Sequence, residues 1–154
     1  MEHPAADPQE HLTHPAAADD ALAALAPPAA AWFRGRFGAP TAAQRLAWPA
    51  LAAGKNLLLS APTGAGKTLA AFLPILGQLL DSPLGGASVR CLYVAPLKAL
   101  GNDIGRNLSE CLDGLSTLLP DGAAPPRLAV RTGDTPTLAV SYTHLRAHET
   151  GRNL

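Results

Sequence analysis

A short apolar run that leads directly into a glycine-rich loop is the feature that most constrains the fold of this 154-residue chain. Residues 55–60 read KNLLLS, and residues 61–68, APTGAGKT, follow at once. The pattern G-x-x-x-x-G-K-[ST] is typical of phosphate-binding loops, because glycines let backbone N–H groups face phosphate oxygens. Ala61 takes the place of the first glycine, and the other pattern positions are filled. The stretch therefore predicts a buried strand, a phosphate-binding loop and the start of a helix.

The residue types in this loop suit a nucleotide with its magnesium ion. A helix that begins at Lys67 directs the positive end of its dipole at the phosphates, and the lysine side chain would reach the β- and γ-phosphates. The Thr68 hydroxyl would take a coordination place on Mg²⁺. Lys67 and Thr68 are thus the catalytic candidates. The predicted nucleotide-binding residues in the loop are Thr63, Gly64, Ala65, Gly66, Lys67 and Thr68.

Strand-like and helix-like segments alternate along the rest of the chain. Residues 89–96 and 127–132 are apolar runs bounded by turn signals and predict two further strands, while 67–80 and 97–119 are predicted helices. This order is typical of an α/β fold, a doubly wound parallel sheet. Three short helices are expected before the first strand, namely ADDALAAL, the stretch with Trp32 and Phe33 that ends at Gly38, and 41–53, closed by Gly54.

Charge is distributed unevenly, although the formal net charge is +0. Residues 1–20 carry five acidic side chains and no lysine or arginine, and they predict a disordered acidic leader. Residues 21–136 carry an excess of four basic side chains, which permits a polyanionic partner without identifying one. The apolar run 21–33 is too short to span a bilayer, and Cys91 and Cys111 lack metal-ligand spacing. We therefore expect a cytoplasmic protein with reduced thiols and no membrane partner.

Three ordered blocks resemble the opening motifs of superfamily-two helicases. They lie within 37–76, 93–108 and 130–136, and they are most similar to the large helicase-related branch of the DEAD/DEAH-box-like ATPases. The resemblance covers about residues 30–136. It implies that 21–136 form the N-terminal part of a first RecA-like lobe, a P-loop NTPase domain, and that the nucleotide is ATP.

The first block resembles the Q motif, in which a glutamine recognises adenine. Gln44 holds that place, and its amide offers a donor and an acceptor side by side for the adenine edge. Thr41-x-x-Gln44 is also a capping box, in which each side chain bonds the other residue's backbone at a helix start. Both interpretations stay open at the level of sequence.

The other two blocks resemble motifs that lie along a nucleic-acid backbone. In PLKAL, Lys98 would neutralise a phosphate, and the backbone at Pro96 and Leu97 would help to fix the strand. In the third block, Gly133 beside Thr132 would allow close backbone approach. The resemblance thus implies a nucleic-acid partner, with DNA favoured over RNA.

Several parts of a complete helicase have no counterpart in the sequence. Hydrolysis in this family requires an apolar strand that ends in Asp-Glu, and the nearest candidate, RLAVRTGD, is interrupted and has no Glu after Asp134. The Ser-Ala-Thr motif and the second lobe are also missing. We therefore expect ATP binding without hydrolysis in this chain, with the remainder of the helicase as its partner.

The segment 137–154 departs from the family pattern, and SYTHLRAHET within it resembles translated sequencing-adapter sequence. We expect it to be a non-family tail. Three alternative interpretations of the whole chain remain. They are a stand-alone non-catalytic module that binds nucleotide or nucleic acid, another P-loop enzyme such as a phosphotransferase, and a gene fragment without a selected function.

Overall fold

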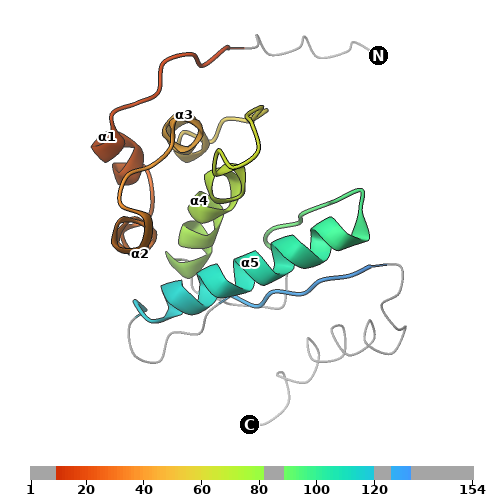
Figure 1. Ribbon diagram of the computed structural model, residues 1–154. Helices are drawn as coiled ribbons and strands as arrows, with labels where there is room; N and C mark the ends of the chain where they lie inside the picture. Colours follow the sequence, from red (N-terminus) through yellow and green to blue (C-terminus); the bar gives the residue numbers. More distant parts are fainter. Residues whose placement is uncertain (1–9, 82–88, 120–125, 133–154) are drawn as a thin grey trace, which may run out of the picture.

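The computed structural model describes residues 10–81, 89–119 and 126–132. Its elements form a helical assembly in which α2 and α3 pack against α4, α1 packs on α3 and α2, and α5 crosses below them (Figure 1). No helix in the described ranges is long and apolar enough to cross a membrane. The helices are α1 (Ala18–Ala23), α2 (Pro27–Phe37), α3 (Ala42–Ala52), α4 (Lys67–Asp81) and α5 (Lys98–Ser116). All five were predicted, and α5 ends at Ser116, a few residues before the expected end at 119.

Both ends of α3 are fixed by local hydrogen bonds. At its start, the Thr41 hydroxyl accepts from the Gln44 backbone N–H at 3.3 Å, and the Thr41 N–H donates to the Gln44 side chain at 2.9 Å. The capping box predicted from the sequence is therefore confirmed. At its end, Gly54 adopts φ +73°, the left-handed conformation that glycine accepts without strain. The N–H groups of Gly54 and Lys55 then bond back to carbonyls of the last turn.

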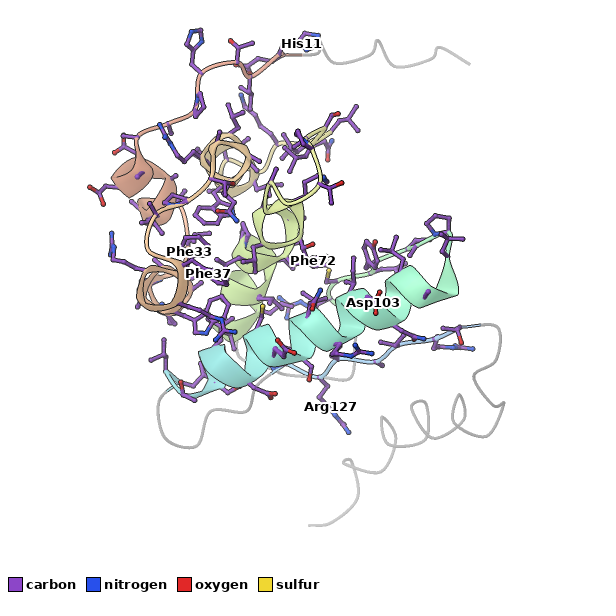
Figure 2. The ribbon with its side chains drawn as sticks, in the orientation of Figure 1. His11, Phe33, Phe37, Phe72, Asp103 and Arg127 are labelled. Carbon is purple, nitrogen blue, oxygen red and sulfur yellow. The ribbon has the colours of Figure 1, made fainter. Side chains whose placement is uncertain are left out.

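The core lies among α1, α2, α4 and α5, with one large side chain contributed by α3. Phe33 on α2 and Trp48 on α3 are buried and meet edge to face, with ring centroids 5.0 Å apart. Figure 2 shows Phe33 and Phe72 on separate helices of this assembly. The buried cluster comprises Ala21, Leu22, Leu25, Ala29, Phe33, Trp48, Phe72, Leu73, Leu76, Leu108, Cys111, Leu112 and Leu115.

Glycines allow two close helix contacts around this core. A Cβ at Gly77 on α4 would lie 2.9 Å from the Cβ of Ala26, just before α2. A Cβ at Gly114 on α5 would lie 2.2 Å from the Trp32 indole nitrogen. At both points a larger residue would require its neighbour, Ala26 or the Trp32 side chain, to shift.

The predicted sheet does not form in the described ranges. The segments 55–60, 89–96 and 127–132 contain no residue in a β-strand. An apolar run predicts a strand, but a strand exists only where its backbone pairs with a neighbour. Instead, Leu58 is 97% exposed, and Leu92 and Val94 are each 78% exposed. These side chains have the composition of buried strand residues without the packing that a sheet provides.

Two of these segments nevertheless contact the helices. Tyr93 meets Phe72 of α4 edge to face, with ring centroids 5.3 Å apart. The segment 126–132 runs along α5, where a Cβ at Gly105 would lie 2.6 Å from Val130 (Figure 1). Their positions are thus set by contacts with α4 and α5.

The N-terminal strap, defined as residues 10–17, lies against α3. The guanidinium of Arg45 donates to the carbonyl oxygens of Ala16 and Pro15, and Lys55 forms an ion pair with Glu10 at 2.7 Å. Helix α1 then begins at Ala18. A disordered leader was expected over 1–20, but residues 10–17 are held by Arg45 of α3 and by Lys55 just beyond it, and α1 begins at Ala18. Residues 1–9 lie outside the described ranges.

Candidate functional site

The predicted phosphate-binding loop adopts the backbone that its glycines allow. Gly64 has φ +82° and Gly66 has φ +77°, both in the left-handed region that other residues rarely enter. Between them, the Ala65 N–H bonds to the Pro62 carbonyl at 3.2 Å and closes a tight turn. The Ala70 N–H bonds to the Gly66 carbonyl at 3.0 Å and starts α4. Loop and helix therefore join in the order that the sequence predicts.

The Lys67 side chain folds back across the start of the loop. Its ammonium donates to the carbonyl oxygens of Ala61 at 2.6 Å and Pro62 at 2.7 Å. One cation thus lies beside the loop, and these two acceptors are uncharged. A phosphate oxygen carries a full negative charge and would compete well for the same donors.

Two side chains at the start of α3 hold the far side of the loop. The Thr41 hydroxyl donates to the Ala65 carbonyl oxygen at 2.9 Å. The Gln44 side-chain nitrogen donates to the Gly66 carbonyl oxygen at 3.3 Å, and Gln44 is only 2% exposed. The glutamine amide thus joins the capping box to the loop. Recognition of adenine by Gln44 is not tested by this geometry and stays a prediction.

These two bonds have a consequence for the direction of the loop N–H groups. A trans peptide is planar, with its C=O and N–H on opposite sides. When α3 holds the Ala65 and Gly66 carbonyls, the N–H groups of Gly66 and Lys67 must therefore point away from α3. These donors belong to the first turn of α4, where an anion is also favoured by the helix dipole.

The donor set suits a triphosphate with its magnesium ion. Backbone N–H groups at a helix start and an ammonium are groups that bind phosphate, and a hydroxyl such as that of Thr68, the second residue of α4, is of a kind that Mg²⁺ accepts as a ligand. Thr63 is exposed beside them, and Thr68 is half-buried. The glycine positions also fit, because a Cβ at Gly66 would lie 2.5 Å from the Gln44 amide nitrogen.

The predicted nucleic-acid residues lie elsewhere, at the start of α5. Pro96 and Leu97 are exposed, Leu97 is the N-cap of the helix, and Lys98 is its first residue. Figure 1 shows the segment 126–132 running along α5 toward this same end of the helix. Gly133 lies outside the described residues. The structure therefore groups this second set apart from the nucleotide loop.

Two residues that contact the loop region were not assigned to the site from the sequence. Thr41 was identified only as a helix cap, and its bond to Ala65 spans 24 residues. Trp48 was not assigned at all, although its indole N–H donates to the Leu69 carbonyl oxygen at 3.3 Å. The available signal was the spacing, since Gln44 and Trp48 lie four residues apart on one face of a helix and Thr41 is its N-cap.

The sequence profile of the DEAD/DEAH box helicases matches residues 41–139. This match includes the loop, the capping box and the start of α5, so the chain belongs to the DEAD/DEAH box helicase family. Within the family, it is similar to the ATP-dependent helicase Lhr-Core of Sulfolobus acidocaldarius, with 43% identity over 76% of this chain and 14% of the relative. It is also similar to the Lhr helicase/probable uracil glycosylase of Mycolicibacterium smegmatis, with 47% identity over 68% of this chain and 7% of the relative.

A solved structure shares the fold. It is that of the Mycobacterium smegmatis helicase Lhr bound to ssDNA and AMP-PNP, with a TM-score of 0.71, 42% identity, and coverage of 79% of this chain and 16% of that chain. The family and this likeness together indicate a RecA-like fold. This chain spans only a small part of the length of the helicases that it matches.

Proposed function

We propose that this chain is the N-terminal part of the first RecA-like lobe of an ATP-dependent helicase. In this proposal the loop from Thr63 to Thr68 binds ATP with its Mg²⁺, and Gln44 recognises adenine. The observation that carries it is the double hydrogen bond from Thr41 and Gln44 to the loop carbonyls, which directs the loop N–H groups away from α3.

The chemistry of each group follows from its place. Lys67 exchanges two neutral carbonyl acceptors for phosphate oxygens, and the Thr68 hydroxyl is a ligand for the metal ion. Bound Mg²⁺ would neutralise charge on the phosphates. Gln44 must release either Thr41 or Gly66, or use its second amide hydrogen, to bond adenine. The sequence has no Asp-Glu strand, so we propose that this chain holds ATP without hydrolysing it.

Nucleic acid is the second proposed partner, with DNA favoured over RNA. The residues assigned to it are Pro96, Leu97, Lys98, Thr132 and Gly133. The support is their sequence resemblance, the course of the segment 126–132 toward the end of α5 that begins at Lys98, and the similarity to a helicase solved with ssDNA. The remainder of a helicase, in a cytoplasmic protein, is the third proposed partner.

Isothermal titration calorimetry with a non-hydrolysable ATP analogue and Mg²⁺ tests the nucleotide site. The wild-type chain should bind, and Lys67→Ala should weaken binding by at least about tenfold, because a charged hydrogen bond contributes roughly 1.5–3 kcal/mol. Lys55→Ala is the matched control, since this lysine pairs with Glu10 outside the loop. Equal affinity of wild type and Lys67→Ala would refute the assignment.

Fluorescence anisotropy with a labelled single-stranded oligonucleotide tests the second site. Lys98→Ala should weaken binding and lower the salt dependence by about 0.7 in the slope of log K against log[salt], the loss of one phosphate contact. Lys55→Ala again controls for net charge. A DNA and an RNA of the same sequence measured in parallel decide the preference. An unchanged slope in Lys98→Ala would contradict the role of this lysine.

A further inference from the structure

Trp48 occupies an unusual place for a core residue. Its side chain is fully buried and packs edge to face on Phe33, as expected of an interior aromatic. Its indole N–H, however, donates to the Leu69 carbonyl oxygen at 3.3 Å. Leu69 is the third residue of α4, directly after Lys67 and Thr68. The indole therefore reaches the helix turn that carries the proposed phosphate and metal ligands.

Trp48 belongs to a set of three residues that bond to carbonyl oxygens at the junction between the loop and α4. Gln44 and Trp48 lie four residues apart on one face of α3, and Thr41 is the N-cap of the same helix. Thr41, Gln44 and Trp48 bond in order to the carbonyl oxygens of Ala65, Gly66 and Leu69. One face of α3 thus runs along the junction between loop and helix, with anchors on both sides of Lys67 and Thr68.

The third anchor adds something that the first two do not. Thr41 and Gln44 fix peptides in the loop before α4, and the buried side chains of α4 begin at Ala70. The bond to Leu69, the third residue of α4, adds an anchor within the first turn and limits how that turn can rotate. The rotation of the first turn determines where the Lys67 and Thr68 side chains point.

We infer that Trp48 is a positioning residue for nucleotide binding: its bond to Leu69 orients the first turn of α4, and with it Lys67 and Thr68. This inference rests on the proposed ATP site. The indole touches no ligand itself and acts through α4. If Trp48 only filled space in the core, an aromatic ring without the N–H would support nucleotide binding equally well.

The variant Trp48→Phe separates the two roles. It keeps an aromatic ring against Phe33 and removes the donor, and no buried donor is left unpaired because the N–H itself is lost. Trp32→Phe is the matched control, because Trp32 packs on α5 at Gly114, away from the loop. Each variant's thermal unfolding is measured first, so that only folded protein enters the binding assay.

In calorimetry with the non-hydrolysable ATP analogue, Trp48→Phe should bind roughly three- to tenfold more weakly than Trp32→Phe, as expected for one lost hydrogen bond. Adenosine, which has no phosphates, should show no difference between them. An ATP-analogue affinity for Trp48→Phe within about twofold of the control, in folded protein, would overturn the inference.

Tryptophan emission gives an independent readout. The chain has two tryptophans, so Trp32→Phe leaves Trp48 as the only one. Addition of the ATP analogue should change the emission of Trp48, and the midpoint of this change should equal the midpoint found by calorimetry. Lys67→Ala should abolish the change. The positioning role would be rejected, and the ATP site kept, if calorimetry shows binding of the analogue, the emission of Trp48 does not change, and Trp48→Phe binds with unaltered affinity. An absence of calorimetric binding in wild type would reject the ATP site, and the inference with it.

Discussion

The Thr41 hydroxyl donates a hydrogen bond of 2.9 Å to the Ala65 carbonyl oxygen and links the start of α3 to the phosphate loop. The oxygen of this Thr41 hydroxyl also accepts a hydrogen bond from the Gln44 backbone N–H. One hydroxyl therefore caps a helix and orients a loop peptide. Stability of α3 and the geometry of the loop depend on the same group.

Replacement of Thr41 by valine should affect both properties. Thr41→Val keeps the side-chain shape and removes the hydroxyl, so we expect a loss of about 1 kcal/mol in the free energy of unfolding, typical of an N-cap. Affinity for the ATP analogue should also fall by roughly fivefold, because the Ala65 peptide loses its anchor. Chemical denaturation and calorimetry measure the two effects. Thr41→Ser, which keeps the hydroxyl, should behave like wild type.

Alanine at the two loop glycines should have unequal effects. Both have positive φ, which costs an alanine about 1–2 kcal/mol. A Cβ at Gly64 meets nothing within 4 Å, whereas one at Gly66 lies 2.5 Å from the Gln44 amide nitrogen. Gly66→Ala should therefore destabilise more than Gly64→Ala. When Gln44 is replaced by alanine, the extra loss in unfolding free energy caused by Gly66→Ala should become smaller. Denaturation of the two single variants and the double variant measures this coupling, and a coupling energy of zero would contradict the contact.

The exposed apolar segment 89–97 should drive self-association. Leu92 and Val94 are each 78% exposed, and apolar extended segments with unpaired backbone favour association. Val94→Lys should lower the associated fraction in sedimentation velocity and leave the unfolding temperature nearly unchanged. Asn102→Lys adds the same charge on an exposed position of α5 and should have a smaller effect. Equal effects of both would point to net charge as the cause.

The ion pair between Glu10 and Lys55 should respond to acid. The hydrogen bond and the charge of Lys55 lower the pKa of the Glu10 carboxyl below its ordinary value. Because the folded-state pKa is lowered, the contribution of the pair is present above the unfolded-state pKa and is lost as pH falls through the folded one. Carboxyl NMR titration should show a lowered midpoint, restored to the ordinary range in Lys55→Ala.

Much of the local structure was predictable because its signals are local. The five helices follow from periodicity and breakers, α3 also from its capping box, and the loop backbone follows from glycines at positions 64 and 66. The capping box was likewise predictable, because its pattern spans only the four residues from Thr41 to Gln44. In each case the favoured conformation is decided by groups a few bonds or one helical turn apart.

The strand prediction shows the limit of such reasoning. Residues 55–60, 89–96 and 127–132 have strand composition, yet none of them is a strand in the described parts of the chain. Composition describes how a segment would suit a buried sheet, while pairing depends on a second segment brought beside it. The N-terminal strap is the opposite case, since a segment of disordered composition is held by Arg45 and Lys55 of another part of the chain.

The sequence by itself determined the glycine loop at 61–68, the helices that flank it and the family to which the chain belongs. Only the tertiary structure decided that Thr41, Gln44 and Trp48 bond to the carbonyls of Ala65, Gly66 and Leu69, across 21 to 24 residues. The physical reason is that backbone preference acts between near neighbours, whereas these bonds exist because core packing lays one face of α3 along the start of α4.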